Sequence, residues 1–258
     1  MNAVSHVVIT GASGSIGAAL AKVYAKQGVH LSLFGRKKVA LETVANECQQ
    51  LFATVSIYCI DVTETDSLQN KLNEIDTEKP VDLVIANAGI VNYLTENDDE
   101  EFWRDTKKLL DVNVIGAFAT VSPLITRMRQ RRHGQIVLIS SMAAYYGLPV
   151  CPAYSASKAA LKAYGEALRG LLCKENVNVS VVFPGFVQSK MSDQFLCNKP
   201  FLMTPEKAAK IIQRGLQKNK ARIAFPLLLN IGLRFLTVLP SAISDFILLQ
   251  LGYGVIKK

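Results

Sequence analysis

Two side chains able to transfer a proton stand four residues apart in the run Tyr154-Ser155-Ala156-Ser157-Lys158. The run begins a stretch of helical periodicity, so this spacing places Tyr154 and Lys158 on one face of a helix. A phenol with a pKa of about 10 is a poor acid or base at neutral pH, and an ammonium held beside it favours the phenolate and lowers that pKa. The pair by itself is also compatible with an ordinary solvent-exposed helix face.

Ser141 and Asn113 favour a proton-transfer site over a plain helix surface. Ser141 follows the apolar run Val137-Leu138-Ile139, and its hydroxyl can hold a substrate oxygen while Tyr154 donates or removes the proton. Asn113 is predicted on the long helix before that strand, where its amide could anchor a water linking Lys158 to solvent. An Asn that only packs the helix is the alternative. We therefore expect Asn113, Ser141, Tyr154 and Lys158 to act together.

A glycine-rich turn follows the first apolar run of the chain and reads Thr10-Gly11-Ala12-Ser13-Gly14-Ser15-Ile16-Gly17. Glycines let a backbone turn sharply and approach a pyrophosphate, which the free N–H groups and the dipole of a helix N-terminus stabilise. A plain tight turn is the alternative, but a position between the first strand and a helix favours dinucleotide binding. The residues predicted to contact the dinucleotide here are Gly11, Ser13, Ser15, Ile16 and Gly17.

The residues after the next strands predict how the rest of the dinucleotide is held. An acid at the end of the second strand selects a ribose 2′-hydroxyl, whereas an Arg accommodates a 2′-phosphate. This strand ends in Phe34-Gly35-Arg36, and Arg36 can form a forked pair with phosphate. The sequence thus predicts NADP(H) rather than NAD(H), with a solvated basic turn as the alternative.

Two further segments are predicted on the nucleotide. Asp61 and Val62, at the end of the third strand, could contact the adenine, although Asp61 could instead cap the following helix. Asn87, Ala88 and Gly89, after the fourth strand, offer small residues where the backbone passes the ribose.

Short β-rich apolar runs alternate with longer stretches of helical periodicity along the chain. This alternation predicts an α/β fold, a Rossmann-type doubly wound parallel sheet of about seven strands with helices on both faces. Strands are expected near residues 5–10, 29–34, 54–60, 81–86, 134–140, 177–183 and 220–225. Ligands of such a sheet bind at the carboxyl ends of its strands, where the segments above would meet.

Taken together, these segments resemble the short-chain dehydrogenases/reductases. The matching elements, in order and spacing over about residues 5–225, are Thr10 to Gly17, Asn87-Ala88-Gly89, Asn113, Ser141, Tyr154, Lys158 and Pro184-Gly185. The resemblance implies a nicotinamide dinucleotide and a Ser-Tyr-Lys-Asn tetrad, with Tyr154 and Lys158 also in contact with the cofactor. It further implies that Pro184, Gly185, Val187 and Ser189 hold the carboxamide, with Ser189 standing where Thr is usual.

Two features depart from the family pattern. Ser15 replaces the middle glycine of the usual turn, with Gly14 one position earlier, which predicts a slightly shifted loop that still contacts phosphate. Soluble tetrameric members usually end in a strand and an Asp-Gly-Gly-like tail, which this chain lacks. We therefore expect a homodimer in place of the usual tetramer.

An apolar extension follows residue 225, so we expect a catalytic domain over 1–225 and a helical extension over 226–258. Its apolar runs are interrupted by Arg234, Pro240 and Asp245, which leaves them too short for a transmembrane helix of about 20 apolar residues. Contact with a membrane surface is expected, with cations for anionic headgroups at Lys218, Lys220, Arg222, Arg234, Lys257 and Lys258. The alternative is a lid over the substrate cleft or a dimer seam.

Composition narrows the class of protein. The chain of 258 residues carries 29 Lys and Arg against 21 Asp and Glu, a formal charge of +8, but no aromatic residues interleave its basic clusters, which argues against nucleic acid. The five cysteines show no metal-ligand spacing, so we expect reduced, packed thiols and no metal site. No signal-peptide-like stretch precedes Val7. We therefore expect a cytoplasmic protein that can meet the cytoplasmic face of a membrane.

The sequence thus predicts an NADP(H)-dependent oxidoreductase that moves a hydride between nicotinamide and a carbonyl or alcohol carbon of a hydrophobic small molecule. Segments 143–152 and 186–202 are expected to line the outer cleft, where Tyr145, Tyr146, Phe195 and Phe201 favour an apolar substrate. Three alternatives stay open: an NAD-linked alcohol oxidation, a nucleotide-binding scaffold without catalysis, and a membrane-associated interaction protein whose functional part is the extension.

Overall fold

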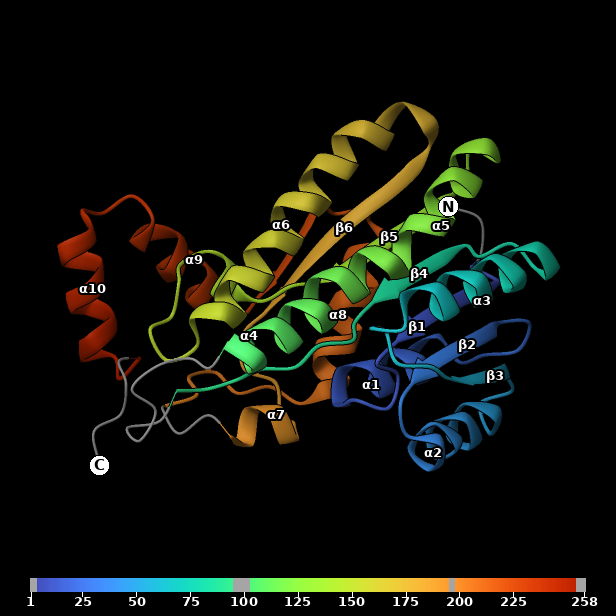
Figure 1. Cartoon of the computed structure of the whole chain (residues 1–258), viewed down its shortest axis with the longest axis horizontal. Coiled ribbons are helices and arrows are strands. Elements are labelled where there is room, and N and C mark those ends of the chain that lie inside the picture. The colour runs from blue at the N-terminus through green and yellow to red at the C-terminus, as the bar shows by residue number, and fades with distance from the viewer. Residues whose placement is uncertain (1–3, 95–102, 195–197, 254–258) are drawn as a thin grey trace.

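The structure, a computed structural model, describes residues 4–94, 103–194 and 198–253. Within them the chain forms a seven-stranded parallel sheet in the order β3-β2-β1-β4-β5-β6-β7 (Figure 1). The strands are β1 (His6–Thr10), β2 (His30–Gly35), β3 (Thr54–Cys59), β4 (Leu83–Ala86), β5 (Gly134–Ile139), β6 (Val177–Pro184) and β7 (Arg222–Phe225). The predicted doubly wound sheet is confirmed, and each strand lies within two residues of its expected bounds.

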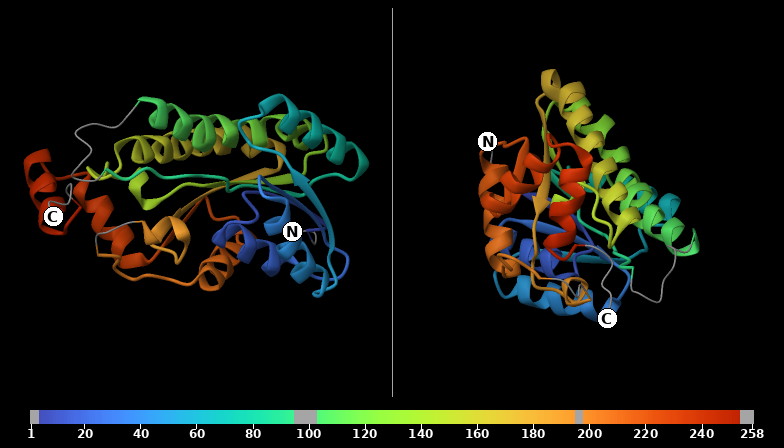
Figure 2. Two further views of the ribbon diagram at one scale, coloured as in Figure 1. Left: turned by 60° about the horizontal axis from the view of Figure 1, so that its bottom comes forward. Right: turned by 90° about the vertical axis from the view of Figure 1, so that its left-hand side faces the viewer.

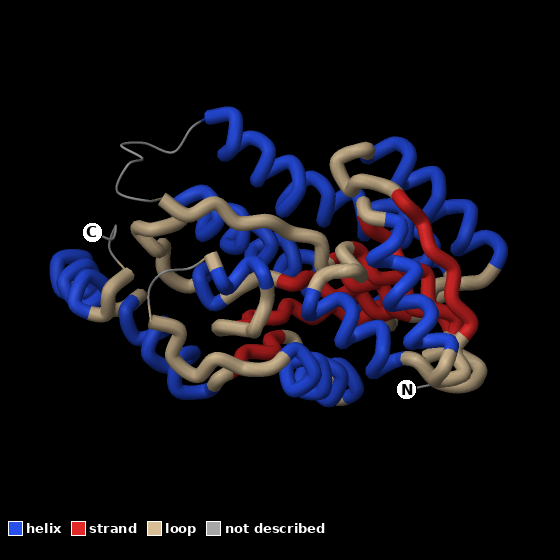
Figure 3. Tube along the Cα trace, turned by 90° about the horizontal axis from the view of Figure 1, so that it is seen from below, coloured by secondary structure: helices blue, strands red, loops and turns tan. Residues whose placement is uncertain are grey.

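Helices cover both faces of this sheet (Figure 2). One face carries α1 (Ser15–Tyr24), α2 (Lys38–Gln49) and α8 (Pro205–Gln217), and the other carries α3 (Thr65–Glu78), α4 (Trp103–Leu110), α5 (Gly116–Gln130) and α6 (Pro152–Leu172). β1, β4 and β5 are buried along their whole length, because helices exclude water from both sides. Figure 3 shows the strands running together between the helices.

Two apolar clusters hold these layers together. The first, on the side of α1, α2 and α8, includes the fully buried Leu20 and Ile212. The second, on the side of α3, α5 and α6, includes Leu72 and Leu168. Burying a Leu or Ile side chain stabilises a fold by about 1.5–3 kcal/mol. The two clusters therefore fix the helices on both faces, and with them the loops at the ends of the strands.

The order of strands reverses between β1 and β4. β2 and β3 extend the sheet on one side of β1, while β4 to β7 extend it on the other. Ligands of open α/β sheets bind outside the carboxyl ends of the strands at such a reversal. The loops that follow β1, β4, β5 and β6 all leave the sheet at this edge, which brings the predicted site residues together.

A π-helical segment, Asp111–Ile115, joins α4 to α5 and carries Asn113. The resulting helical run, 103–130, is long and apolar enough to cross a membrane, with 50% of its apolar window buried. It packs against α3 and α6 over the sheet. We therefore assign this run to the core of the fold.

The extension forms two helices, α9 (Leu227–Leu236) and α10 (Ser241–Gln250), at one end of the molecule (Figures 1 and 3). The predicted helical extension is thus found. Its buried residues join a third apolar cluster, in which Leu236 and Leu248 pack with Met142 and Phe183 of the catalytic part. The extension and the sheet therefore share one core.

Most of the basic residues that were predicted to meet anionic headgroups together with the extension do not lie near α9. Lys218 and Lys220 precede β7 and Arg222 begins it, whereas α9 follows its carboxyl end. These three cations therefore lie at the opposite edge of the sheet from α9, and Arg222 donates to Glu166 Oε1 at 2.8 Å. Lys257 and Lys258 lie outside the described residues. Of the six predicted cations, Arg234 is therefore the one that the structure places on the extension helices.

Candidate active site

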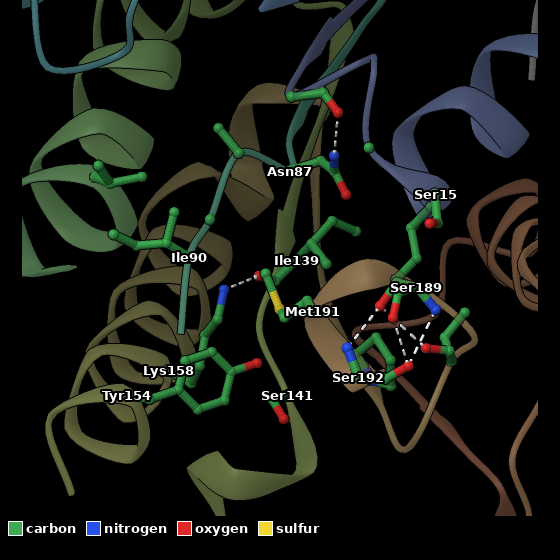
Figure 4. Close-up of a pocket in the computed structure, with 18 of the residues that line it drawn as sticks. Ser15, Asn87, Ile90, Ile139, Ser141, Tyr154, Lys158, Ser189, Met191 and Ser192 are labelled. Atoms are coloured by element: carbon green, nitrogen blue, oxygen red, sulfur yellow. Dashed lines mark hydrogen bonds between the residues drawn. The ribbon is translucent and has the colours of Figure 1, made fainter. Parts of the chain in front are cut away.

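A cavity of about 560 Å³ at the carboxyl edge of the sheet gathers most of the predicted site (Figure 4). The predicted residues that line it are Gly11, Ser13, Ser15, Ile16, Arg36, Asp61, Val62, Asn87, Ala88, Gly89, Ser141, Tyr154, Lys158, Pro184, Gly185, Val187 and Ser189. Gly17 and Asn113 are buried behind this wall. Asn113 hydrogen-bonds to the lining residue Ile90, and Gly17 leaves room for the turn at Gly11.

The glycine-rich turn packs its backbone closely against neighbouring backbone and leaves the start of α1 open to a ligand. Gly11 has a φ of +64°, and a Cβ there would meet the Ala88 Cα at 2.8 Å. A Cβ at Gly17 would lie 2.3 Å from the Gly11 carbonyl oxygen, so neither position accepts a side chain. Gly14 is the N-cap of α1, and no side chain caps this helix. The first N–H groups of α1 are therefore available to an anion in the cavity.

Asn87 fastens the loop after β4 to this turn. Its Nδ2 donates to the carbonyl oxygens of Thr10 at 3.0 Å and Gly11 at 3.1 Å. The Thr10 hydroxyl oxygen accepts hydrogen bonds from the backbone N–H groups of Asn87 at 3.1 Å and Ala88 at 3.3 Å. The two loops on either side of the strand-order reversal are thus locked to one another.

Arg36 and Asp61 stand together on the rim of the cavity. Arg36 Nη1 lies 3.8 Å from Asp61 Oδ2, while Asp61 Oδ1 accepts hydrogen bonds from the N–H and hydroxyl of Thr63, both at 3.0 Å. The N-cap of α3 is Glu64, so Asp61 does not cap that helix. Of the two roles considered for Asp61, the structure excludes the cap. Lys37, which was not predicted as a site residue, also lines the cavity.

Tyr154 points its hydroxyl towards Ser141 (Figure 4). Burial raises the pKa of Tyr154 to about 12, and a hydrogen bond with Ser141 opposes the rise. Ser141 Oγ accepts the N–H of Ala143 at 3.2 Å, which leaves the Ser141 hydrogen to be donated. The expected lowering of the Tyr154 pKa is not found, because removing water from the phenolate outweighs the favourable contacts among the protein's own groups.

Lys158 shares a helix face with Tyr154, as predicted. Its Nζ donates to the carbonyl oxygen of Ile139 at 3.0 Å and lies 5.6 Å from the centroid of the Tyr154 ring. Lys158 is only 4% exposed, and burial lowers the pKa of its ammonium to about 8. The group is therefore still mostly protonated at neutral pH, and two of its three N–H donors remain for other partners.

The amide of Asn113 connects three segments around this pair. Its Nδ2 donates to the Ile90 carbonyl oxygen at 2.9 Å and to Ser157 Oγ at 3.0 Å, and its Oδ1 accepts the N–H of Ile90 at 2.8 Å. A Cβ on Gly89 would stand 3.3 Å from both Asn113 Oδ1 and Lys158 Nζ. Both amide hydrogens are thus used within the protein, and anchoring a water stays a prediction for Oδ1 alone.

The segment after β6 is held by a short helix, α7 (Lys190–Asp193). Ser189 and Ser192 form a capping box, in which each hydroxyl oxygen accepts the other residue's backbone N–H at 3.0 Å. Gly185 donates its N–H to the Phe225 carbonyl oxygen at 2.8 Å, which ties the segment to β7. These bonds place Ser189 on the cavity wall.

Part of the wall comes from residues that sequence reasoning missed. Leu229, Leu233 and Tyr253 of the extension line the cavity. Leu229 and Leu233 are four residues apart and so share a helix face, but no pattern in the sequence specifies what that face packs against. Of the aromatic residues predicted at the outer cleft, Tyr145 stacks on Phe183 with ring centroids 4.8 Å apart, Phe201 is exposed, and Phe195 lies outside the described residues.

Two of the four cysteines in the described part of the chain are packed in the interior. Cys48 and Cys151 are buried as expected, and Cys151 lines the cavity. Cys59 and Cys173 are exposed, because they end an edge strand and a helix. Cys197 lies outside the described residues.

The sequence that contains these residues matches a known protein family. The family model described as short chain dehydrogenase matches residues 5–199. The chain belongs to the short-chain dehydrogenases. As a member of this family it is an oxidoreductase.

Relatives of this short-chain dehydrogenase span nearly its whole length. An uncharacterized oxidoreductase of Myxococcus xanthus (strain DK1622) is 35% identical over 239 residues, which are 92% of this chain and 94% of that protein. The 17-beta-hydroxysteroid dehydrogenase 13 of Homo sapiens is 30% identical over 246 residues, 92% of this chain and 80% of that protein.

Solved structures share the fold. A short-chain dehydrogenase from Sphingobium yanoikuyae in complex with NADPH has a TM-score of 0.79 at 22% identity, over 86% of this chain and 88% of that one. A short chain dehydrogenase from Mycobacterium paratuberculosis bound to NAD has a TM-score of 0.74 at 22% identity, over 85% and 94%. Both likenesses establish the Rossmann-like architecture.

Proposed function

We propose that the protein is an NADP(H)-dependent reductase of a hydrophobic ketone or aldehyde. The observation that carries this proposal is that Tyr154, Ser141 and Lys158 meet the glycine-rich turn in one cavity. Proton transfer and dinucleotide binding need these two groups within reach of one another. The same arrangement can run in reverse, as oxidation of an alcohol.

The residues present fit a nicotinamide dinucleotide. The uncapped start of α1 offers backbone N–H groups to a pyrophosphate, and the positions of Gly11 and Gly17 leave no room for side chains. Asp61 and Val62 would flank the adenine. The backbone of Asn87 to Gly89 would pass close to a ribose. Lys158 would hold the nicotinamide ribose, and Pro184 to Ser189 the carboxamide.

Arg36 supports NADP(H) over NAD(H). β2 ends in Phe34-Gly35-Arg36 without an acid that would repel a 2′-phosphate. Arg36 lines the cavity, and its distance of 3.8 Å from Asp61 leaves the guanidinium fork free to turn to a phosphate. Lys37 adds a second cation at the same rim. One structural relative is in complex with NADPH and another is bound to NAD, so the preference rests on these residues.

The chain's own residues divide the chemistry as follows. When bound, the nicotinamide supplies the hydride to the carbonyl carbon. The Ser141 hydroxyl donates a hydrogen bond to the carbonyl oxygen and orients it, and Tyr154 donates its phenolic proton to that oxygen as negative charge develops there. Lys158 then stabilises the resulting phenolate by its charge. Asn113 holds the backbone on which these groups stand.

The pKa of Tyr154 supports the reductive direction. Reduction uses the protonated phenol, and the burial that raises this pKa to about 12 keeps the phenol protonated at neutral pH. Oxidation needs the phenolate, which the same burial disfavours.

The outer end of the cavity supports an apolar substrate. Leu148, Phe186 and Leu233 line the cavity and pack in the same apolar cluster as Tyr154, and hydrophobic walls with few polar groups are typical of sites for apolar small molecules. One relative bears the name of a hydroxysteroid dehydrogenase. A lipid-like carbonyl compound is therefore the substrate class we propose.

The proposal is tested by titrating the protein with NADPH and NADH and then following nicotinamide absorbance with a panel of ketones and long-chain aldehydes. Tyr154→Phe should abolish turnover while NADPH still binds. Tyr164→Phe is the matched control, because Tyr164 lies on the same helix but stacks on Phe118 away from the cavity. Nucleotide binding without Tyr154-dependent turnover would indicate a scaffold, and no nucleotide binding would refute the proposal.

A membrane contact through the extension is a second part of the proposal, placed at the cytoplasmic face. It is supported by the exposed apolar side chains of α9 and α10. A homodimer is also proposed, and light scattering of the purified protein measures it directly.

A further inference from the structure

Helices α9 and α10 each carry two apolar faces. Leu233 and Tyr253 are buried in the third cluster and line the active-site cavity. The outer side chains, each at least 48% exposed, are Leu227, Leu228, Ile231, Phe235, Val238, Ile243, Phe246, Leu249 and Leu251. Exposed apolar surface of this extent marks an interaction surface. α9 lines the cavity, and α10 packs in the same cluster through Leu248, so both helices connect the active-site region to the outer surface.

The charged residues of α9 and α10 are engaged by the tyrosines of the Ser141 loop. The Arg234 guanidinium lies 5.9 Å from the centroid of the Tyr145 ring, and the Tyr146 hydroxyl donates to Asp245 Oδ1 at 3.1 Å. Among residues 227–253, these are the two with charged side chains. The outer surface is therefore mostly apolar, with Arg234 and Asp245 as its exposed charged residues, and both contacts tie the extension to the loop that carries Ser141.

Either a second copy of the chain or a lipid bilayer could cover this outer surface, and net charge distinguishes between them. A second copy of the chain carries the same formal charge of +8, so charge provides no attraction between copies at this surface, whereas an anionic bilayer attracts each copy. Each helix has ten residues, about half of what a spanning helix needs. Helices of this length with an apolar face lie in the interface between lipid and water.

We propose that α9 and α10 dock on an anionic lipid surface through their outer faces, and that the carbonyl substrate enters the cavity from the lipid past their inner faces. The substrate is then a membrane-dissolved carbonyl compound with an alkyl chain. Docking leaves the catalytic groups in place and shortens the route from lipid to Tyr154. The substrate route rests on the proposed reductase function, and the docking does not.

The docking is tested by co-sedimentation with vesicles of phosphatidylcholine and phosphatidylglycerol (3:1). Phe235→Glu and Phe246→Glu place a charge on the outer faces, at side chains 59% and 62% exposed. Val39→Glu is the matched control, since Val39 is 76% exposed on α2, far from the extension (Figure 1). Each Phe variant should lose vesicle binding by about tenfold or more, while Val39→Glu should bind as the unaltered chain does.

The substrate route is tested with NADPH and two ketones, one long-chain and carried in the vesicles, the other short and water-soluble. The Phe variants should reduce the soluble ketone at an unchanged rate and the vesicle-borne ketone at least about tenfold more slowly. Thermal unfolding of each variant, compared with Val39→Glu, verifies that the fold is intact.

Three results would overturn the inference. One is vesicle binding by Phe235→Glu and Phe246→Glu equal to that of Val39→Glu. A second is an equal loss of turnover on both ketones, which would give these residues a structural role. A third is a dimer in solution that dissociates in the Phe variants without any vesicle binding, which would make the surface a seam between copies. Vesicle binding with no turnover of either ketone would instead support docking and refute the reductase proposal.

Discussion

The side-chain amide of Asn113 forms hydrogen bonds with both backbone groups of Ile90, accepting its N–H at 2.8 Å and donating to its carbonyl at 2.9 Å. The second amide hydrogen goes to Ser157 Oγ, and that hydroxyl donates to the Tyr154 carbonyl oxygen at 2.7 Å. One buried amide thus fixes the distance between the loop after β4, which is predicted to contact the dinucleotide, and the helix that carries Tyr154.

Asn113→Ala should therefore damage both stability and turnover. It leaves the partly buried N–H and carbonyl of Ile90 without their side-chain partner, which should lower the free energy of unfolding by about 1–3 kcal/mol. It should also lower kcat tenfold or more with little change in KM, because Tyr154 is no longer held relative to the cofactor. Urea denaturation and steady-state kinetics measure the two effects. An unchanged kcat in a folded variant would refute the positioning role.

The pH dependence of the two directions should differ. Because the pKa of Tyr154 is about 12, its phenolate fraction rises about tenfold per pH unit through the neutral range, and kcat/KM for alcohol oxidation should climb accordingly. Reductive kcat/KM should stay level and fall only above about pH 8, where Lys158 loses its proton. Initial rates in both directions between about pH 6 and 9 decide this. A plateau of the oxidative rate near neutrality would contradict it.

Lys158→Met should remove activity and change how stability depends on pH. Burial lowers the pKa of Lys158 from 10.5 to about 8, so between these values the unfolded chain binds more protons than the folded one. The free energy of unfolding of the unaltered chain should therefore rise with pH across this window, relative to Lys158→Met, by roughly 3 kcal/mol at most. Denaturation midpoints at several pH values give the difference, and parallel curves would contradict the prediction.

Two glycines on helices should respond to alanine with opposite signs. Gly17→Ala puts a Cβ 2.3 Å from the Gly11 carbonyl oxygen, which should destabilise the protein by about 1–3 kcal/mol and weaken NADPH binding. Gly170→Ala on α6 meets no atom within 4 Å and should stabilise by about 0.5–1 kcal/mol, since alanine favours a helix. Thermal unfolding of both variants compares them. Equal effects would show that the close approach at Gly17 is relieved by movement of the turn.

Arg36→Ala should invert the cofactor preference. Loss of a forked pair with a 2′-phosphate should weaken NADPH binding by about 10- to 100-fold, while NADH binding changes little. Lys38→Ala is the control, because Lys38 lies two residues further on, at the start of α2, and is directed to Glu42, with its Nζ 3.9 Å from Glu42 Oε1. Fluorescence titration with both nucleotides measures the change. If Arg36→Ala and Lys38→Ala behave alike, the turn acts only through its overall charge.

The sequence predicted the structure best where a short local pattern is compatible with one backbone conformation. Continuous apolar runs predicted the buried strands, and Thr10 to Gly17 predicted the turn at the end of β1, because glycine spacing and strand position restrict the backbone there. The placement of Ser141 and Tyr154 in one cavity followed from the rule that parallel strands end at one edge.

Other features depend on contacts between distant segments and leave no local pattern. Nothing in the composition of 111–115 predicts a π-helix. The pKa of Tyr154 was expected to fall because Lys158 is near, but the outcome depends on how much water the surrounding chain removes. The role of Leu233 in the cavity wall depended on where α9 packs, which helical periodicity does not specify.

Tyr253 places a limit on when the active site can form during synthesis. It is buried in the third cluster and lines the cavity that contains Tyr154. Domains generally fold from the N-terminus as the chain emerges, so β1 to β6 can assemble while the extension is still within the ribosome. The wall of the cavity, however, is completed only when residue 253 has emerged. A nascent chain of this protein can therefore bind nucleotide before it can enclose a substrate.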